Sequence, residues 1–398
     1  MNLLLVYAVA LLLAVLLSCF ARQSIVSAAV LFLAAGLMVG KGVFGTAMPN
    51  RDLLYRMAEL ALFAVLFTDG MKTGGLSEIR QQWHLPGRAL MIGMPLTIGG
   101  IALLAHYLIG LSWWPAFLIG AALSPTDPVF VSAIFGLEAV PARIKYVLNI
   151  ESGLNDGMSL PIVAIILAVI HHGGESPLQT VGHLLVGIGI GVTIPWAAYL
   201  LQRVSFLGAA GVFERLNAFA VGLLVLTVSE ALHANLFLAA FAAGVTIVTL
   251  SQDAAKAFHE FGELIAELLK LGALLIFGAR IAGIVLTPMP AMDYLFAALA
   301  AFAIRPPAIW LSLLGTELPR NEVLTIGWFG PKGFASVVYA LMILRLGSPE
   351  AQHIARVMAL AVGGSIAIYS STDILVGRWY QRLAGDRTDA QGLPTKAV

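Results

Sequence analysis

The segment ESGLNDG, residues 151–157, gathers oxygen-bearing side chains at the start of an apolar stretch that reaches to about Ile170. Its polar members are Glu151, Ser152, Asn155 and Asp156. Ionisable side chains are expensive inside a bilayer, and where they occur they usually mark a path for ions or protons. Carboxylate, hydroxyl and amide oxygens together suit a hard cation such as Na⁺. The chemistry expected of this segment is therefore the binding and release of a cation and a proton.

If the segment is helical, these four side chains and the Ser159 hydroxyl share one side of the helix. At about 100° per residue they fall within an arc of about 140°. Burial disfavours the charged form of a carboxylate and a nearby cation favours it, so a buried aspartate can hold either a proton or a cation. We therefore expect Asp156 to carry both in turn. Glu151 has a structural alternative, an ion pair with Arg305, because an unpaired charge in lipid should not persist.

A second polar segment, SPTDPVF, lies upstream and places Asp127 between Thr126 and Pro128 in another apolar stretch. Pro125 and Pro128 lack backbone N–H groups and clash with the preceding helical turn. One interpretation is a doubly kinked helix. The other is an unwound stretch between two half-helices, whose free carbonyls can coordinate a cation and whose helix N-terminus favours a negative neighbour such as Asp127.

A matching break is expected in the apolar stretch at 321–345. Within seven residues it contains Gly327, Gly330, Pro331, Lys332 and Gly333. Two interrupted helices in corresponding halves of a chain indicate an inverted-repeat transporter with its site at the midplane of the membrane. We expect Asp127 and Lys332 to neutralise helix dipoles where the two broken helices cross. The alternative for Lys332 is that its ammonium reaches the membrane surface.

The composition supports a membrane protein. The 398 residues are 59% hydrophobic and 11% charged, whereas about 25% of a soluble domain is charged. The net charge of +1 gives no reason to expect nucleic acid as a partner. The first apolar segment lacks a basic start and an A-x-A cleavage site, so it is expected to be a transmembrane helix rather than a signal peptide.

Apolar runs of about 20 residues predict an all-α polytopic membrane protein with about thirteen transmembrane helices. The expected spans are 2–20, 24–40, 53–68, 87–110, 113–135, 146–170, 178–201, 213–232, 234–250, 264–286, 291–314, 321–345 and 353–376. Together they form one membrane-embedded domain, 1–376, followed by a short cytoplasmic tail, 377–398. The excess of Lys and Arg on one side of this arrangement places the N-terminus outside and the C-terminus inside.

Other charges fall within or near these spans. Glu59 is expected to pair with a basic residue such as Arg280, or else to serve as a second proton site. Glu263, Glu267 and Lys270 follow a helical spacing that predicts an interfacial face at the entrance to the tenth span.

The chain resembles the monovalent cation:proton antiporters of the NhaP and eukaryotic Na⁺/H⁺-exchanger branch. The resemblance covers most of the chain and is carried by four motifs in the same order and spacing: SPTDPVFVSAIF, ESGLNDG, the Arg305–Pro306 pair and GWFGPKG at 327–333. Many relatives have arginine where this chain has Lys332. The difference bears on charge, because buried lysine can lose its proton and arginine effectively cannot.

The resemblance implies an NhaA/NhaP-like fold of inverted repeats with two broken, crossing helices. It implies that Asp156 binds cation and proton alternately, that Asn155 positions it, and that Ser152, Glu151 and Thr126 add oxygens around Na⁺. It further implies a homodimer and electroneutral exchange. A core of about 87–170 and 291–376 would shift against a scaffold of about 1–70 and 178–286.

The leading hypothesis is thus a secondary antiporter that exchanges Na⁺ (or Li⁺) for H⁺, in the inner membrane of a bacterium, in contact with lipid and without a cofactor. A K⁺/H⁺ antiporter of similar build is the first alternative. An intramembrane hydrolase is disfavoured, because the chain has no H-E-x-x-H, G-x-G-D or G-x-S-x-G motif. A channel would not need the titratable Asp156.

Overall fold

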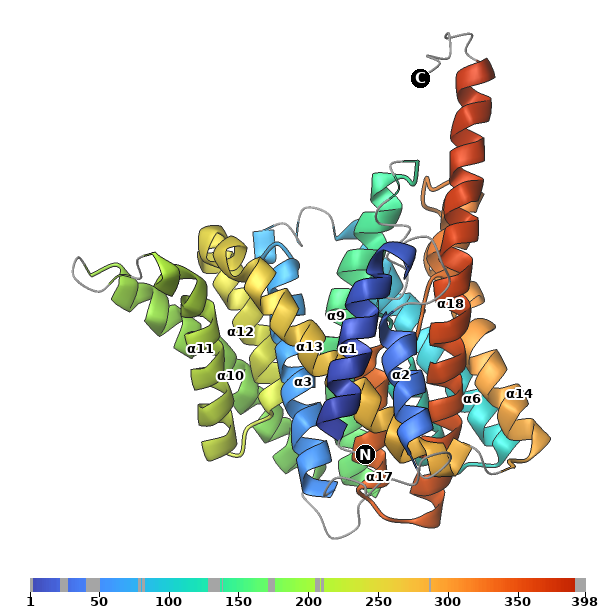
Figure 1. Cartoon of the computed structure of the whole chain (residues 1–398), viewed down its shortest axis with the longest axis horizontal. Helices are drawn as coiled ribbons and strands as arrows, with labels where there is room; N and C mark the ends of the chain where they lie inside the picture. The colour runs from blue at the N-terminus through green and yellow to red at the C-terminus, as the bar shows by residue number, and fades with distance from the viewer. Residues whose placement is uncertain are drawn as a thin grey trace.

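Each of the thirteen expected spans contains helix in the computed structural model, in which only helices and one short backbone bridge give regular structure to the described residues (Figure 1). The structure describes residues 3–21, 28–40, 51–77, 80, 83–127, 137, 139–170, 176–204, 208, 211–285 and 288–390. Five of the helical segments are long and apolar enough to cross a membrane: His84–Ile109, Ala142–Ile170, Pro177–Gln202, Ala291–Ser312 and Pro349–Tyr369. The predicted all-helical fold is therefore confirmed for the part of the chain that is described.

One group of helices comes from the first three spans and the seventh to tenth. These are α1 (Leu3–Ala21), α2 (Ala28–Val39), α3 (Arg51–Lys72), α10 (Pro177–Gln202), α11 (Val212–Ala231), α12 (Leu236–Leu250) and α13 (Gln252–Val285). Within this group α3 packs on α12 and α2 on α13. Glycines permit the close approach: a Cβ on Gly70 of α3 would lie 2.5 Å from the Phe241 carbonyl oxygen of α12. Small residues at such crossings are typical of membrane helices.

The other group holds the fourth to sixth and the last three spans. It comprises α5 (His84–Arg88), the π-helical turn η1 (Ala89–Gly93), α6 (Met94–Ile109), α7 (Trp113–Leu123), α9 (Ala142–Ile170), α14 (Ala291–Phe302), α15 (Arg305–Ser312), α16 (Arg320–Trp328), α17 (Phe334–Leu344) and α18 (Pro349–Ala390). Here α7 packs on α6 and α9, and α18 on α14 and α17.

Both expected helix breaks are present where the structure describes them. α7 ends at Leu123, two residues before Pro125, and α16 is separated from α17 by residues 329–333. The two breaks meet: Thr126 and Lys332 form an antiparallel backbone bridge, and the Asp127 N–H donates to the Pro331 carbonyl oxygen at 3.0 Å. The second half of the fifth span, at 128–136, lies outside the described residues.

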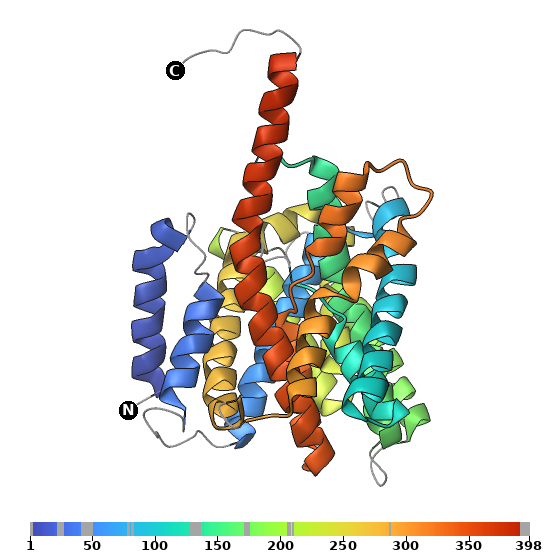
Figure 2. The ribbon, with the colours of Figure 1, turned by 90° about the vertical axis from the view of Figure 1, so that its right-hand side faces the viewer.

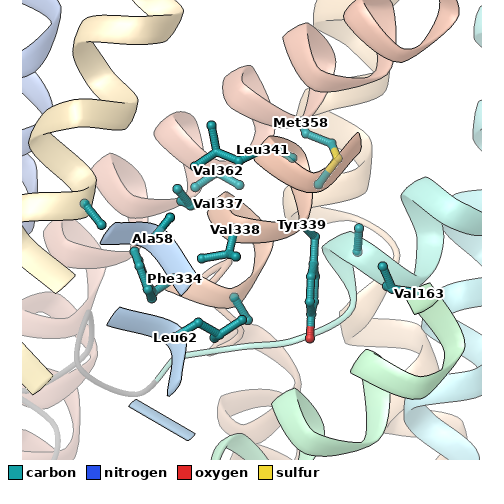
Figure 3. Packing of buried hydrophobic residues seen from close by; sticks show 14 of the residues in the cluster. Ala58, Leu62, Val163, Phe334, Val337, Val338, Tyr339, Leu341, Met358 and Val362 are labelled. Atoms are coloured by element: carbon teal, nitrogen blue, oxygen red, sulfur yellow. The ribbon is translucent and has the colours of Figure 1, made fainter. Parts of the chain in front are cut away.

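The half-helix α17 is buried on all its sides. Figure 3 shows Phe334, Val338 and Tyr339 of α17 among side chains of α3, α9 and α18. A helix that is hydrophobic all round belongs in the centre of a bundle. Its position fixes the second break deep inside the protein.

Two boundaries differ from the prediction by more than ten residues. α13 begins at Gln252, well before the expected start of the tenth span at 264, and α18 continues as helix to Ala390, past the expected end of the last span at 376. Hydropathy locates apolar stretches, whereas backbone hydrogen bonding continues a helix through charged residues. The last turns of α18 project beyond the other helices in both views (Figures 1 and 2).

Candidate functional site

The Glu151–Arg305 ion pair, expected from the sequence, is present and buried. Arg305 Nη1 donates to Glu151 Oε1 at 2.6 Å and Nη2 to Oε2 at 2.9 Å, with both side chains 3% exposed. This bidentate geometry joins α9 to the start of α15. Gly330, in the second break, is required beside it: a Cβ there would overlap the Cδ and Nε of Arg305. The pair thus holds α9, α15 and the second break together.

The hydroxyl of Thr126 connects the first break to the middle of α9. Asn155 Nδ2 donates to Thr126 Oγ1 at 2.8 Å, and Ser152 Oγ lies 3.2 Å from the same oxygen. All three side chains are buried. The hydrogen bond to Thr126 therefore orients the Asn155 amide and directs its Oδ1 away from Thr126.

Among the buried oxygens of α9 that lack a hydrogen-bond partner in the described residues are Asn155 Oδ1 and Asp156 Oδ1. The Asp156 side chain is buried, and its backbone carbonyl accepts a hydrogen bond from the Tyr339 hydroxyl at 3.2 Å. Burying an uncompensated carboxylate is costly unless a proton or a cation neutralises it. The arrangement can therefore bind one or the other at Asp156.

Asp127, in the first break, lies beside the N-terminus of α17. The helix is capped by Gly333, and a Cβ on this glycine would come within 2.9 Å of the Asp127 Cβ. The carboxylate thereby lies near the positive end of the half-helix dipole, as the sequence predicts for a charge at a helix break.

Lys332 is fully buried, so the alternative in which its ammonium reaches the membrane surface is wrong. Its backbone N–H donates to Ser365 Oγ of α18 at 2.6 Å, and its Nζ has no hydrogen-bond partner among the described residues. The charges that interact with the ammonium are those of Arg305 and Glu151. The Lys332 side chain is buried because α17 and α18 cover the point where the two breaks meet.

A cavity of about 570 Å³ lies between α9 and the helices α3 and α13. The first break supplies Asp127, and α9 supplies Asn149 and Gly153. The side chains from α3 and α13 are those of Thr68, Asp69, Lys72, Glu260, Glu263, Glu267 and Lys270. Asn149 and Gly153 lie on one face of α9, and this face continues to Asp156 within a turn. The cavity thus reaches close to the buried carboxylate.

Asp69 and Lys270 belong to this cavity but are not identified as site residues from the sequence. Both interact electrostatically with Asp156. Asp69 comes three residues before Lys72, and Lys270 three after Glu267, at spacings that put each pair on one helix face. That spacing is the available signal, but it does not say which face lines a cavity.

Glu59 pairs with Arg345, so the expected pair with Arg280 is wrong. The Arg345 Nη1 lies 2.9 Å from Glu59 Oε1, and its guanidinium covers the Tyr55 ring at 4.3 Å from the centroid. Because α17 ends at Leu344, Arg345 emerges beside the early turns of α3. This contact lies about 15 Å along α3 from Asp69, given 1.5 Å per residue, and so at the far end from the cavity.

Comparison with known proteins gives a consistent family signal. The family model described as sodium/hydrogen exchanger, transmembrane, matches residues 7–372. The K⁺/H⁺ antiporter NhaP2 of Shewanella oneidensis is 25% identical over 81% of this chain and 57% of its own length. The K⁺/H⁺ antiporter NhaP of Alkalimonas amylolytica is 26% identical over 87% of this chain and 61% of its own. The chain therefore spans about three-fifths of the length of these relatives.

The fold has a solved counterpart. The sodium proton antiporter MjNhaP1 from Methanocaldococcus jannaschii, in its structure at pH 8, superposes with a TM-score of 0.77 over 97% of this chain and all of that one. The sequence identity is 18%, so the likeness is one of fold.

Proposed function

Since the chain belongs to the sodium/hydrogen exchanger family, we propose that this integral membrane protein is a secondary antiporter that exchanges a monovalent cation for H⁺. Asp156 carries both ions, and they compete for its carboxylate. The observation that carries the proposal is the buried Asp156 Oδ1 without a hydrogen-bond partner among the described residues, close to the inner end of a cavity.

Asp156, Asn155, Ser152 and Thr126 supply oxygens to the cation, with Asp127 nearby. Both oxygens of Glu151 accept hydrogen bonds from Arg305, so in our proposal Glu151 positions the site rather than touching the ion. Exchange proceeds by alternating access of a core to the two sides. The core moves only when Asp156 is neutralised, because a bare carboxylate crosses a low-dielectric barrier at high cost. In the present state the cavity lies at one end of α3, and the Glu59–Arg345 contact joins the other end of α3 to the C-terminus of α17.

Na⁺ or Li⁺ is the proposed substrate, and K⁺ is a second candidate because the relatives named above are K⁺/H⁺ antiporters. We further propose a homodimer in the plasma membrane of a bacterium, with the N-terminus outside, the C-terminus inside and the cavity facing the cytoplasm.

The direct test is to reconstitute the protein in proteoliposomes and to record internal pH while Na⁺, Li⁺ or K⁺ is added separately. The membrane potential is clamped in one arm of the experiment and free in the other. Proton movement driven by Na⁺ or Li⁺ supports the first candidate, and a response to K⁺ alone supports the second. No response to any of the three cations would refute the function.

Asn155 is expected to set the charge balance of exchange. Asn155→Asp places a second carboxylate beside Asp156, so the site binds one more proton or cation per cycle. We expect the rate in the variant to become sensitive to an imposed membrane potential while the wild type stays insensitive. The measurement is the initial rate of pH change at several clamped potentials. An unchanged response to potential in Asn155→Asp would contradict this role.

A further inference from the structure

Lys270 is a buried positive charge on the path that the proposed function assigns to a cation. Its side chain is 5% exposed, and it lines the same cavity as Asp69 and Asp127. Its Nζ lies 2.6 Å from Glu267 Oε2, one turn earlier on α13. An ammonium is itself a monovalent cation, so Lys270 places a positive charge on the path of the ion that the protein is proposed to carry.

The cavity is acidic overall. Five carboxylates line it, from Asp69, Asp127, Glu260, Glu263 and Glu267, against the two ammonium groups of Lys72 and Lys270. A recess lined by one sign of charge with low-dielectric walls concentrates ions of the opposite sign. The cavity therefore attracts cations, and the two lysines work against that attraction.

The two lysines differ in depth. Lys72 is 32% exposed and is bound by Glu263 at 2.9 Å, with Asp69 at 3.8 Å. Lys270 is almost fully enclosed, and its charge interacts with Asp127 and Asp69 and with Asp156 itself. Salt and water screen a charge at the mouth, whereas an enclosed charge acts at nearly full strength. Of the two lysines, Lys270 is therefore the one whose charge repels a cation bound at Asp156.

We propose that Lys270 is an affinity-setting residue of the transport site, a fixed ammonium that weakens cation binding at Asp156 from the cavity side. The proposal rests on the proposed function. Glu267 restrains the ammonium on α13, which keeps it from pairing with Asp69 or Asp127 and blocking the path. In this role Lys270 acts through the electrostatic potential of its ammonium rather than by contact with the ion. Weak binding on this side favours release of the cation into the cavity.

The test is the concentration of cation that gives half-maximal exchange, measured with cation added from each side of oriented vesicles. Lys270→Gln removes the charge and is expected to lower this concentration about three- to tenfold from the cavity side, with little change from the other side. Lys270→Arg keeps the charge and should stay near the wild type. Lys72→Gln is the matched control at the mouth and should change the value less than twofold. An unchanged value in Lys270→Gln, or an equal fall in Lys72→Gln, would overturn the proposal.

A second variant covers the case in which Lys270→Gln does not fold. Glu267→Gln leaves the ammonium in place but removes its restraint, so the half-maximal concentration should rise several-fold. A value at or below that of the wild type overturns the proposal.

A binding readout separates this inference from the function on which it rests. Thermal stabilisation of the purified protein in detergent is followed as a function of Na⁺, Li⁺ or K⁺ concentration. A wild type that binds a cation but moves no protons refutes the antiporter, whereas an active wild type with unshifted binding in Lys270→Gln refutes only the role of Lys270.

Discussion

Asp156→Asn is expected to abolish cation-dependent proton movement and to leave the fold intact. The amide has the shape of the carboxylate but can neither take up a proton nor balance the charge of a cation. The variant core therefore carries neither the proton nor the cation across the membrane. Asp156 Oδ1 has no hydrogen-bond partner among the described residues, and removal of an uncompensated buried charge does not weaken packing. We expect the exchange rate to fall at least about a hundredfold, to the background of empty vesicles, with a melting temperature equal to or above that of the wild type.

The same vesicle assay and a melting curve in detergent check both halves of this prediction. Asp253→Asn is the matched control, because it makes the same change at an exposed position at the start of α13. It should retain wild-type exchange. Residual cation-driven proton flux in Asp156→Asn, above that of empty vesicles, would mean that another group carries the proton.

We expect the largest losses of stability from variants that remove one partner of the Glu151–Arg305 pair. Breaking a buried ion pair on one side leaves an uncompensated charge and costs about 3–5 kcal/mol. The two halves are not equivalent here, because Lys332 lies close enough to interact with both partners. Glu151→Gln leaves the enclosed Arg305 guanidinium without its carboxylate, whereas Arg305→Met leaves Glu151 with Lys332 as a substitute partner. Glu151→Gln should therefore be the more destabilised of the two.

Melting temperatures of the purified variants in detergent measure this order. The double variant Glu151→Met/Arg305→Met removes both charges and is expected to recover much of the loss, as apolar replacements of buried pairs often do. If Glu151→Gln instead melts like the wild type but transports nothing, Glu151 is a ligand of the ion rather than a structural partner.

The features that the sequence predicts are those governed by local chemistry. Proline at 125 and the cluster around Pro331 disrupt helix wherever they occur, and a carboxylate in an apolar run requires a partner, which pointed to Arg305. The remaining features depend on how helices pack across long separations in the chain. Glu59 pairs with Arg345, 286 positions away, and no pattern in the chain distinguishes Arg345 from Arg280. Likewise, the burial of Lys332 and the exposure of Asp69 and Lys270 to a cavity follow from the arrangement of α3, α13 and α17 in space.

The length of α18 has a mechanical consequence. Its 42 residues make a rod of about 63 Å at 1.5 Å per residue, about twice the thickness of the hydrocarbon core. Near its middle, Ser365 holds the backbone of Lys332 at the second break, and the far end stands clear of the bundle (Figure 2). One continuous helix therefore connects the projecting turns to the break that holds Lys332, so a displacement of those turns would be transmitted to the break.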